Sequence, residues 1–111
     1  MIFIFGSLHS GKRAVAASLL GCGMEELSRR AMWDVQELAA QSGDLDALAE
    51  KLSHYDAVIA TETGSGIVPL GAAERAAREN AGRLNCLLAE HSTAVVRVFC
   101  GIPLVIRGNL P

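Results

Sequence analysis

The stretch "MIFIFGSLHSGKRAVAASLL", residues 1–20, decides the fold that the sequence predicts. Its apolar start is typical of a buried strand, and a helical apolar pattern begins after the next basic residues. Strand, glycine loop and helix, in this order, are the setting in which the pattern GxxxxGK[ST] binds phosphate. Gly6, Gly11 and Lys12 match that pattern, and Arg13 stands at its last position.

This loop is predicted to bind a nucleotide. Backbone N–H groups at the start of a helix converge on anionic oxygens, and glycine lets the chain turn closely enough. A lysine adds a mobile charge that follows the β and γ phosphates. An ordinary strand-to-helix turn with a surface lysine is the alternative. The predicted nucleotide-binding residues are Gly6, Ser7, Leu8, His9, Ser10, Gly11, Lys12 and Arg13.

A second buried strand is predicted at residues 57–61, "AVIAT", and Glu62 follows it directly. An acidic residue at the carboxyl end of such a strand, beside a phosphate loop, is where Mg²⁺ or a water on it is held. We therefore expect Glu62 to bind the metal and to share catalysis with Lys12, with Mg²⁺ as cofactor and ATP or GTP as substrate. A glutamate in solvent is the alternative. Arginine offers no lone pair to a cation, so the hydroxyl of Thr61 or Thr63 could replace the metal contact that Arg13 cannot make.

The loop after this strand leaves on the same edge of the sheet as the phosphate loop. It has too few glycines for a dinucleotide fingerprint, so we interpret it as a substrate loop. Its predicted residues are Thr63, Gly64, Ser65 and Gly66.

Helices are predicted between and after these strands. Apolar residues at spacings of three and four predict one helix over residues 24–40, with Trp33 at the core edge or in an interface and the charged face, including Asp34, in solvent. Asp44 is placed to cap a second helix. Residues 70–92 predict the longest helix, whose alanines indicate close packing.

Two more strands end the chain, at residues 94–100 and 104–108. The connection between them is too short for a parallel crossover, so they predict an antiparallel hairpin at the sheet edge. The predicted fold is therefore α/β, a three-layer sandwich like that of P-loop NTPases, with a mostly parallel sheet of about four strands. We expect a single P-loop nucleotide-binding domain over residues 1–111. Exposed apolar sheet edges predict a homo-oligomer.

Composition narrows the partners and the compartment. Half of the 111 residues are apolar, the net charge is −2, and no basic run occurs, which argues against nucleic acid or an acidic membrane as partner. No apolar stretch is long enough to span a membrane, and no secretory signal begins the sequence. Three cysteines without paired spacing indicate reduced thiols, so we expect a cytoplasmic protein.

The histidines differ in where the predicted sheet places them. His54 and His91 each precede a strand, at the edge opposite to the one where ligands bind in open α/β sheets, so both are expected to be structural or exposed. His9 lies within the phosphate loop, on the ligand edge.

Four blocks together resemble a known family. They are "GSLHSGKR" at 6–13, "ETGSGIVP" at 62–69, "AGRLN" at 81–85 and "CGIPLVIRG" at 100–108. In order and register they resemble the patterns GGxRSGKS, NExGxGxVP, AGRxNQ and SGxPxxxK of the bifunctional adenosylcobinamide kinase / adenosylcobinamide-phosphate guanylyltransferase of cobalamin biosynthesis. The chain looks like a shortened member of that family.

The resemblance implies an enzyme that phosphorylates the hydroxyl of the aminopropanol arm of adenosylcobinamide with ATP or GTP. It also implies transfer of GMP from GTP to that phosphate through a guanylylated histidine. The arginine-rich stretch at residues 25–37 contains no histidine, so guanylyl transfer is not expected. By resemblance, phosphates would be bound by Gly6, Gly11 and Lys12, the metal would lie near Glu62, the substrate loop would be shaped by Gly64, Gly66 and Pro69, and Arg83 and Asn85 would serve the site or subunit packing.

Two rival functions remain open from the sequence. One is a non-catalytic GTP- or ATP-binding or regulatory protein that has lost the chemistry, which Arg13 and the missing histidine favour. The other is a kinase for an unrelated small metabolite.

Overall fold

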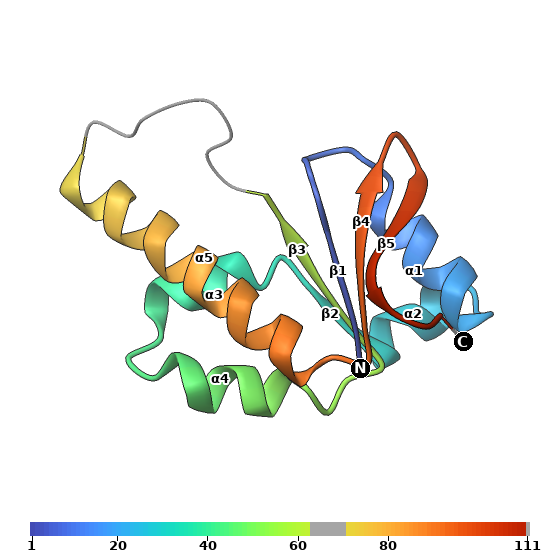
Figure 1. Cartoon of the computed structure of the whole chain (residues 1–111), viewed down its shortest axis with the longest axis horizontal. Helices are drawn as coiled ribbons and strands as arrows, with labels where there is room; N and C mark the ends of the chain where they lie inside the picture. Colours follow the sequence, from blue (N-terminus) through green and yellow to red (C-terminus); the bar gives the residue numbers. More distant parts are fainter. Residues whose placement is uncertain (63–70, 111) are drawn as a thin grey trace.

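A computed structural model describes residues 1–62 and 71–110 of the chain (Figure 1). Within these residues strands and helices largely alternate. The elements are β1 (Ile2–Gly6), α1 (Lys12–Leu20), α2 (Met24–Arg30), β2 (Ala31–Trp33), α3 (Gln36–Gln41), α4 (Leu45–Leu52), β3 (Ala57–Thr61), α5 (Ala72–His91), β4 (Ala94–Phe99) and β5 (Ile102–Gly108).

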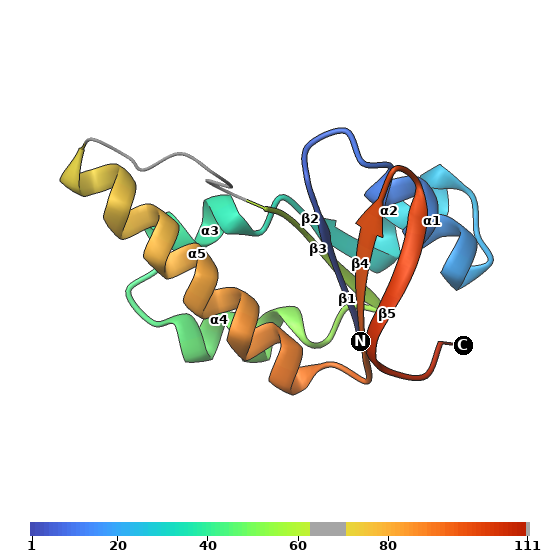
Figure 2. The ribbon, with the colours of Figure 1, turned by 45° about the horizontal axis from the view of Figure 1, so that its top comes forward.

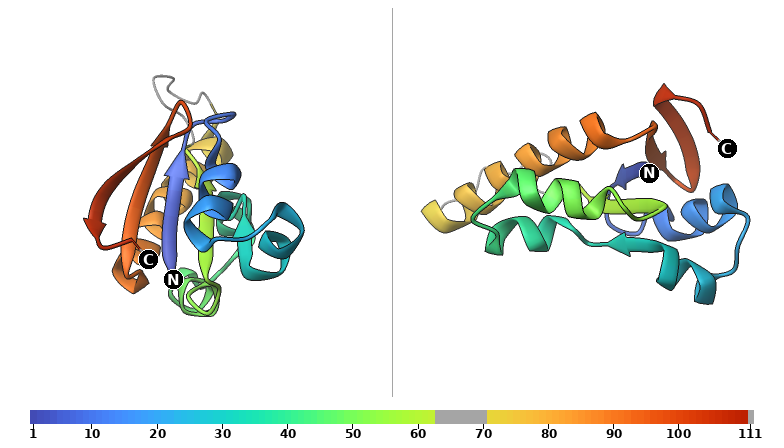
Figure 3. Two further views of the ribbon diagram at one scale, coloured as in Figure 1. Left: turned by 90° about the vertical axis from the view of Figure 1, so that its right-hand side faces the viewer. Right: turned by 90° about the horizontal axis from the view of Figure 1, so that it is seen from below.

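The strands form one mostly parallel sheet in the order β2-β3-β1-β4-β5. β1 lies at its centre, where Phe3 is in register with Val58 of β3 and Val95 of β4. β5 alone runs antiparallel, paired with β4 so that Phe99 faces Ile102. The predicted C-terminal edge hairpin is confirmed, and Figure 3 shows β5 at the outer edge of the sheet.

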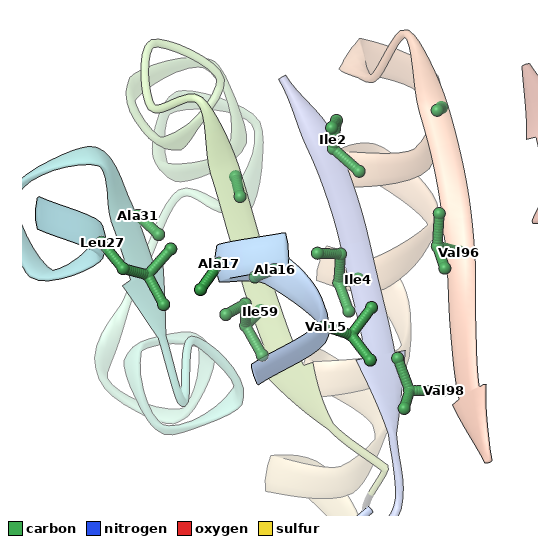
Figure 4. Packing of buried hydrophobic residues seen from close by; sticks show 12 residues of the cluster. Ile2, Ile4, Val15, Ala16, Ala17, Leu27, Ala31, Ile59, Val96 and Val98 are labelled. Atoms are coloured by element: carbon green, nitrogen blue, oxygen red, sulfur yellow. The ribbon is translucent and has the colours of Figure 1, made fainter. Parts of the chain in front are cut away.

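Helices cover both faces of the sheet, because its central strands are apolar on both sides. Ile2 and Ile4 of β1 belong to one buried cluster with residues of α1 and α2, whereas Phe3 belongs to a second cluster with residues of α3, α4 and α5. Successive side chains of a strand point to opposite faces, which is why neighbours in β1 enter different clusters. Figure 4 shows Val15 of α1 lying against Ile4 and Val98. The three layers expected from the sequence are therefore present.

The predicted helix over residues 24–40 is wrong. The structure ends α2 at Arg30, forms β2, and begins α3 only at Gln36. β2 pairs parallel with β3, with Ala31 opposite Ala57 and Trp33 opposite Ile59. The apolar spacing of three and four is satisfied by the two short helices α2 and α3, and burial in the sheet makes the residues between them a strand. The sheet has five strands rather than about four because of this one.

The other helices follow the sequence more closely. Asp44 caps α4 as predicted, accepting a hydrogen bond from Ala47 N at 3.1 Å. α5 buries Ala81, Leu84 and Leu88 of its predicted apolar face and crosses α3 and α4 (Figure 2). No helix in residues 1–62 and 71–110 has the length and apolar character needed to cross a membrane.

Candidate functional site

A cavity of about 590 Å³ opens at the carboxyl ends of the parallel strands. This edge of a parallel sheet is where ligands bind in open α/β folds. Its lining comes from the loop after β1, the start of α1, and the ends of β2 and β3. The lining residues are Leu8, His9, Ser10, Gly11, Lys12, Arg13, Ala14, Met24, Trp33, Asp34, Ile59 and Thr61.

Lys12 is the first residue of α1 and lies inside the loop that precedes it. Its Nζ donates a hydrogen bond to the backbone carbonyl of Ser7 at 2.7 Å, and only 9% of the residue is exposed. A surface lysine, the alternative considered from the sequence, is therefore not what this turn contains. Burial lowers the pKa of Lys12, while the charges of Asp34 and Glu62 oppose that shift.

Glycine is required at both ends of the loop by close backbone contacts. A Cβ on Gly6 would lie 2.6 Å from the carbonyl oxygen of Val98 and 2.8 Å from Ser10 Oγ. Gly11 has φ 88°, a left-handed conformation that side chains disfavour, and packs against Gly101 in the β4–β5 turn. Gly101 N donates to Ser10 O at 2.7 Å, which ties the loop to that turn (Figure 1).

Ser10 carries a buried hydroxyl in the floor of this loop. The residue is 6% exposed, and its Oγ has no hydrogen-bond partner among the residues that the structure describes. Buried hydroxyls are normally paired, so an unpaired one beside free helix-start amides indicates room for a polar ligand or water.

Arg13 points its guanidinium over the ring of Trp33, 5.4 Å from the ring centroid. Such a cation–π contact contributes about 0.5–1 kcal/mol where the cation is exposed. Trp33 also packs on the edge of the buried cluster between α1, α2 and the sheet, which is one of the two places expected for it. The pair forms the wall of the cavity between α1 and β2.

Glu62 follows β3 as predicted, but its carboxylate is engaged by Arg97 of β4. Arg97 Nε donates to Oε1 at 2.9 Å and Nη2 to Oε2 at 3.3 Å. Glu62 N donates to Gly6 O at 2.8 Å, so the residue lies beside the start of the loop without lining the cavity. Its side chain is 21% exposed.

Asp34 is the acidic residue that the cavity does contain, and the sequence reasoning missed it. Its Oδ1 accepts a hydrogen bond from Thr61 Oγ1 at 3.3 Å. Thr61 N in turn donates to Gln36 Oε1 at 3.0 Å, which joins the ends of β2 and β3. The sequence offers only a weak signal for it: "AMW" before Asp34 resembles "AVIAT" before Glu62, but the three residues also fit the helical spacing of the stretch around them.

The remaining predicted residues divide into those near the cavity and those away from it. His9 lines the cavity, in a left-handed conformation with φ 61°. His54 and His91 are exposed at the opposite edge, as expected, and Nε2 of His54 lies 3.4 Å from Oε1 of Glu50. Arg83 lines a separate hollow between α4 and α5. The substrate loop of Thr63, Gly64, Ser65 and Gly66, with Pro69, lies outside the described residues.

Comparison with known proteins gives one family. A family model described as cobinamide kinase / cobinamide phosphate guanyltransferase (CobU) matches residues 24–106, about three quarters of the chain. The match includes β2, β3 and their ends, and it begins after the loop and α1. No curated protein matches the chain.

Proposed function

Because the chain belongs to the cobinamide kinase / cobinamide phosphate guanyltransferase family, we propose that it is a P-loop nucleotide-binding protein that acts as an adenosylcobinamide kinase. In this proposal residues 1–111 are one nucleotide-binding domain. The loop between Gly6 and Lys12 binds the phosphates of ATP or GTP, and the γ-phosphoryl group goes to the hydroxyl of the aminopropanol arm of adenosylcobinamide. The observation that carries the proposal is the buried Lys12 at the start of α1, held inside a glycine loop.

The chain's own groups have defined tasks in this reaction. Amides at the start of α1 bind phosphate oxygens, and the ammonium of Lys12 leaves the carbonyl of Ser7 for the β and γ phosphates. The guanidinium of Arg13, oriented by Trp33, stabilises the charge of the transferred group. Phosphoryl transfer depends on such positioning and charge stabilisation more than on covalent chemistry.

The oxygen donors near the loop fit a Mg²⁺ ion that is held mainly by phosphates and water. The ion needs only one or two protein oxygens, and a carboxylate has lone pairs beyond the two that Arg97 uses on Glu62. Glu62, through water, and the hydroxyl of Thr61 would hold it. The chemistry that Mg²⁺ supplies when bound is neutralisation of charge on the β and γ phosphates.

The direct test is incubation of the protein with adenosylcobinamide, Mg²⁺ and labelled ATP or GTP. Phosphorylated product without labelled protein is expected, because covalent guanylyl transfer needs a nucleophile at the α-phosphate and the arginine-rich stretch at residues 25–37 contains no histidine. Labelled protein would assign the guanylyltransferase reaction as well. Phosphorylation of a different alcohol instead would assign an unrelated metabolite kinase.

A non-catalytic nucleotide-binding protein is the second candidate. Two observations favour it: Arg13 occupies the metal-ligand position of the loop, and the carboxylate of Glu62 is already paired with Arg97. Nucleotide binding by calorimetry without any phosphorylated product would support this candidate over the kinase. A cytoplasmic location, expected from the cysteines, stays a prediction.

We also propose that the chain forms a homo-oligomer through β5. Both faces of this edge strand are exposed, with Ile102 at 59% and Ile106 at 60%. An apolar edge strand offers unpaired backbone groups to a second strand, and a copy of β5 in antiparallel orientation satisfies both the backbone and the apolar side chains.

A further inference from the structure

We infer that Gly101, in the turn between β4 and β5, is a positioning residue that directs the amide of Gly11 toward a bound phosphate. This inference rests on the proposed binding of nucleotide phosphates by the loop. It adds the C-terminal hairpin, which the loop pattern does not include, to the parts of the chain that determine nucleotide affinity.

The hairpin of β4 and β5 contacts both glycines of the loop. A Cβ on Gly6 would lie 2.6 Å from the carbonyl oxygen of Val98. Gly101 N donates to the carbonyl oxygen of Ser10 at 2.7 Å, and a Cβ on Gly11 would lie 3.3 Å from Gly101 Cα. Figure 2 shows the loop after β1 and the β4–β5 turn at the same end of the sheet. The loop therefore packs against the hairpin at its first and at its last glycine.

The bond from Gly101 to Ser10 fixes the direction of the next amide. The peptide unit between Ser10 and Gly11 is trans and planar, so its C=O and its N–H point in opposite directions. Gly101 holds the carbonyl oxygen on the side of β4 and β5. The N–H of Gly11 therefore points away from these strands. In the sheet order β2 and β3 lie on the other side of β1, and their ends line the cavity.

The amide of Gly11 is available to a ligand. Its N–H donates to no group within residues 1–62 and 71–110, and Gly11 lines the cavity. The buried Oγ of Ser10, also in the lining, has no partner in the same part of the chain. Two unpaired donors on adjacent residues, at the positive end of a helix, fit an anionic oxygen.

Gly101 can hold Ser10 only while the turn keeps an uncommon backbone conformation. The two residues that connect β4 to β5 both have positive φ, 52° at Cys100 and 75° at Gly101. Every residue of β5 is exposed, and an edge strand of this kind opens locally more easily than the core. Opening would free the carbonyl of Ser10 and let the peptide unit rotate. The apparent affinity for phosphate then falls in proportion to the fraction of molecules in which the turn is formed.

Replacement of the Gly101 amide by an ester tests the inference directly. Cys100 allows residues 100–111 to be made by synthesis and ligated to residues 1–99 at its thiol, which gives the full chain. The ester removes the N–H and adds no side chain. The matched control is an ester at Asn109, whose N–H donates to no group in the part of the chain that the structure describes. The same ligated chain with all its amides is the reference.

We expect the Gly101 ester to weaken binding of ATP, GTP and inorganic tripolyphosphate by about threefold to tenfold, the scale of one lost hydrogen bond. Tripolyphosphate has no base or ribose, so a similar loss for all three ligands places the effect on the phosphates. Calorimetry at a temperature where every chain is folded by circular dichroism measures it, and the Asn109 ester should bind like the reference. A merely structural bond would lower the free energy of unfolding and leave these affinities unchanged.

Two substitutions at Gly101 give an independent check in the recombinant protein. The side chain of Gly101→Ala meets no atom within 4 Å but disfavours the positive φ, so this variant should bind tripolyphosphate more weakly than the wild type. Gly101→Asn should recover part of the affinity, because asparagine tolerates this conformation better. In the wild type, tripolyphosphate should slow hydrogen exchange of the Gly101 amide, since the coupling between loop and turn is reciprocal.

Each other result overturns the inference in a distinct way. If the Gly101 ester binds tripolyphosphate within about twofold of the Asn109 ester, the hairpin does not position the loop, while nucleotide binding by the loop stands. If only ATP and GTP lose affinity, Gly101 acts on the base or the ribose and not through the amide of Gly11. If the all-amide chain binds none of the three ligands, the proposed nucleotide binding fails and the role of Gly101 fails with it.

Discussion

Lys12 Nζ donates a 2.7 Å hydrogen bond to the carbonyl oxygen of Ser7, five residues earlier in the same loop. The bond holds the ammonium inside the curve of the loop, beside the amides at the start of α1. When a nucleotide phosphate enters the loop, the ammonium of Lys12 replaces its one carbonyl partner with several anionic oxygens. This replacement is favourable because a buried charge is stabilised most by an opposite charge. Lys12 is therefore the first residue to test.

Lys12→Ala is expected to weaken ATP or GTP binding by about 2 kcal/mol, the scale of a hydrogen bond to a charged group. Isothermal titration calorimetry measures the change. Lys51→Ala is the matched control, because Lys51 is exposed on α4 and does not line the cavity. Equal nucleotide affinities of the wild type and Lys12→Ala would contradict the proposal that this loop binds the phosphates.

The lowered pKa of Lys12 predicts a pH effect on stability of the free protein. The folded state binds this proton more weakly than the unfolded chain, where the pKa is near its usual 10.5. As pH rises from the lowered pKa toward 10.5, the unfolded state holds more protons, so the free energy of unfolding gains a positive contribution. Denaturant unfolding at several alkaline pH values should show this gain in the wild type and not in Lys12→Met. A gain of the same size in both proteins would assign it to other groups.

Gly6→Ala is expected to destabilise the protein by roughly 1–3 kcal/mol, the cost of overpacking a tight site. The added Cβ would lie 2.6 Å from a backbone oxygen of β4, which cannot move without distorting the sheet. Gly82→Ala makes the same chemical change at an exposed position of α5, where the added Cβ meets no atom within 4 Å outside the nearby backbone of its own helix, and it should stabilise by roughly 0.5–1 kcal/mol. Chemical denaturation measures the change in the free energy of unfolding for both variants. A Gly6→Ala variant as stable as the wild type would contradict the close packing of the loop.

Arg13→Ser is expected to strengthen the Mg²⁺ dependence of nucleotide binding, because it returns a hydroxyl to the position where metal-binding loops have one. Titrating Mg²⁺ against nucleotide affinity in the variant and the wild type measures this. Loss of the contact with Trp33, the single tryptophan of the sequence, should also change its fluorescence. Arg29→Ser, at an exposed position of α2, is the control, and identical Mg²⁺ dependence in all three proteins would argue against a metal at this position.

Ile106→Lys is expected to shift the protein toward monomers if copies pair through β5. A charged side chain on an edge strand opposes strand pairing, and Ile106 is 60% exposed in the single chain. Sedimentation velocity over a range of concentrations measures the change. Leu38→Lys on α3 places the same charge at another exposed apolar residue and should leave the assembly unchanged. A wild type that is monomeric at every concentration would contradict the proposal.

The sequence by itself determined the central strand-loop-helix unit, β3 with Glu62 at its end, the cap of α4, the long helix and the terminal hairpin. These elements depend on local signals: runs of apolar residues, spacings of three and four, a capping Asp44 and a connection too short for a crossover. Each signal lies within a few residues along the chain, so these elements could be predicted without knowing which other segments pack against them.

Only the tertiary structure decided β2 and the residues that β2 brings to the cavity. Ala31–Trp33 is three residues long and lies within a stretch of helical apolar spacing. It becomes a strand because β3 supplies the backbone partners and the buried surface. The pairing of Glu62 with Arg97, the Thr61 bond to Asp34 and the contact of Arg13 with Trp33 join residues at least 20 positions apart. Because such contacts depend on which strands lie side by side, the strand order, and not the local pattern, determined which carboxylate faces the cavity.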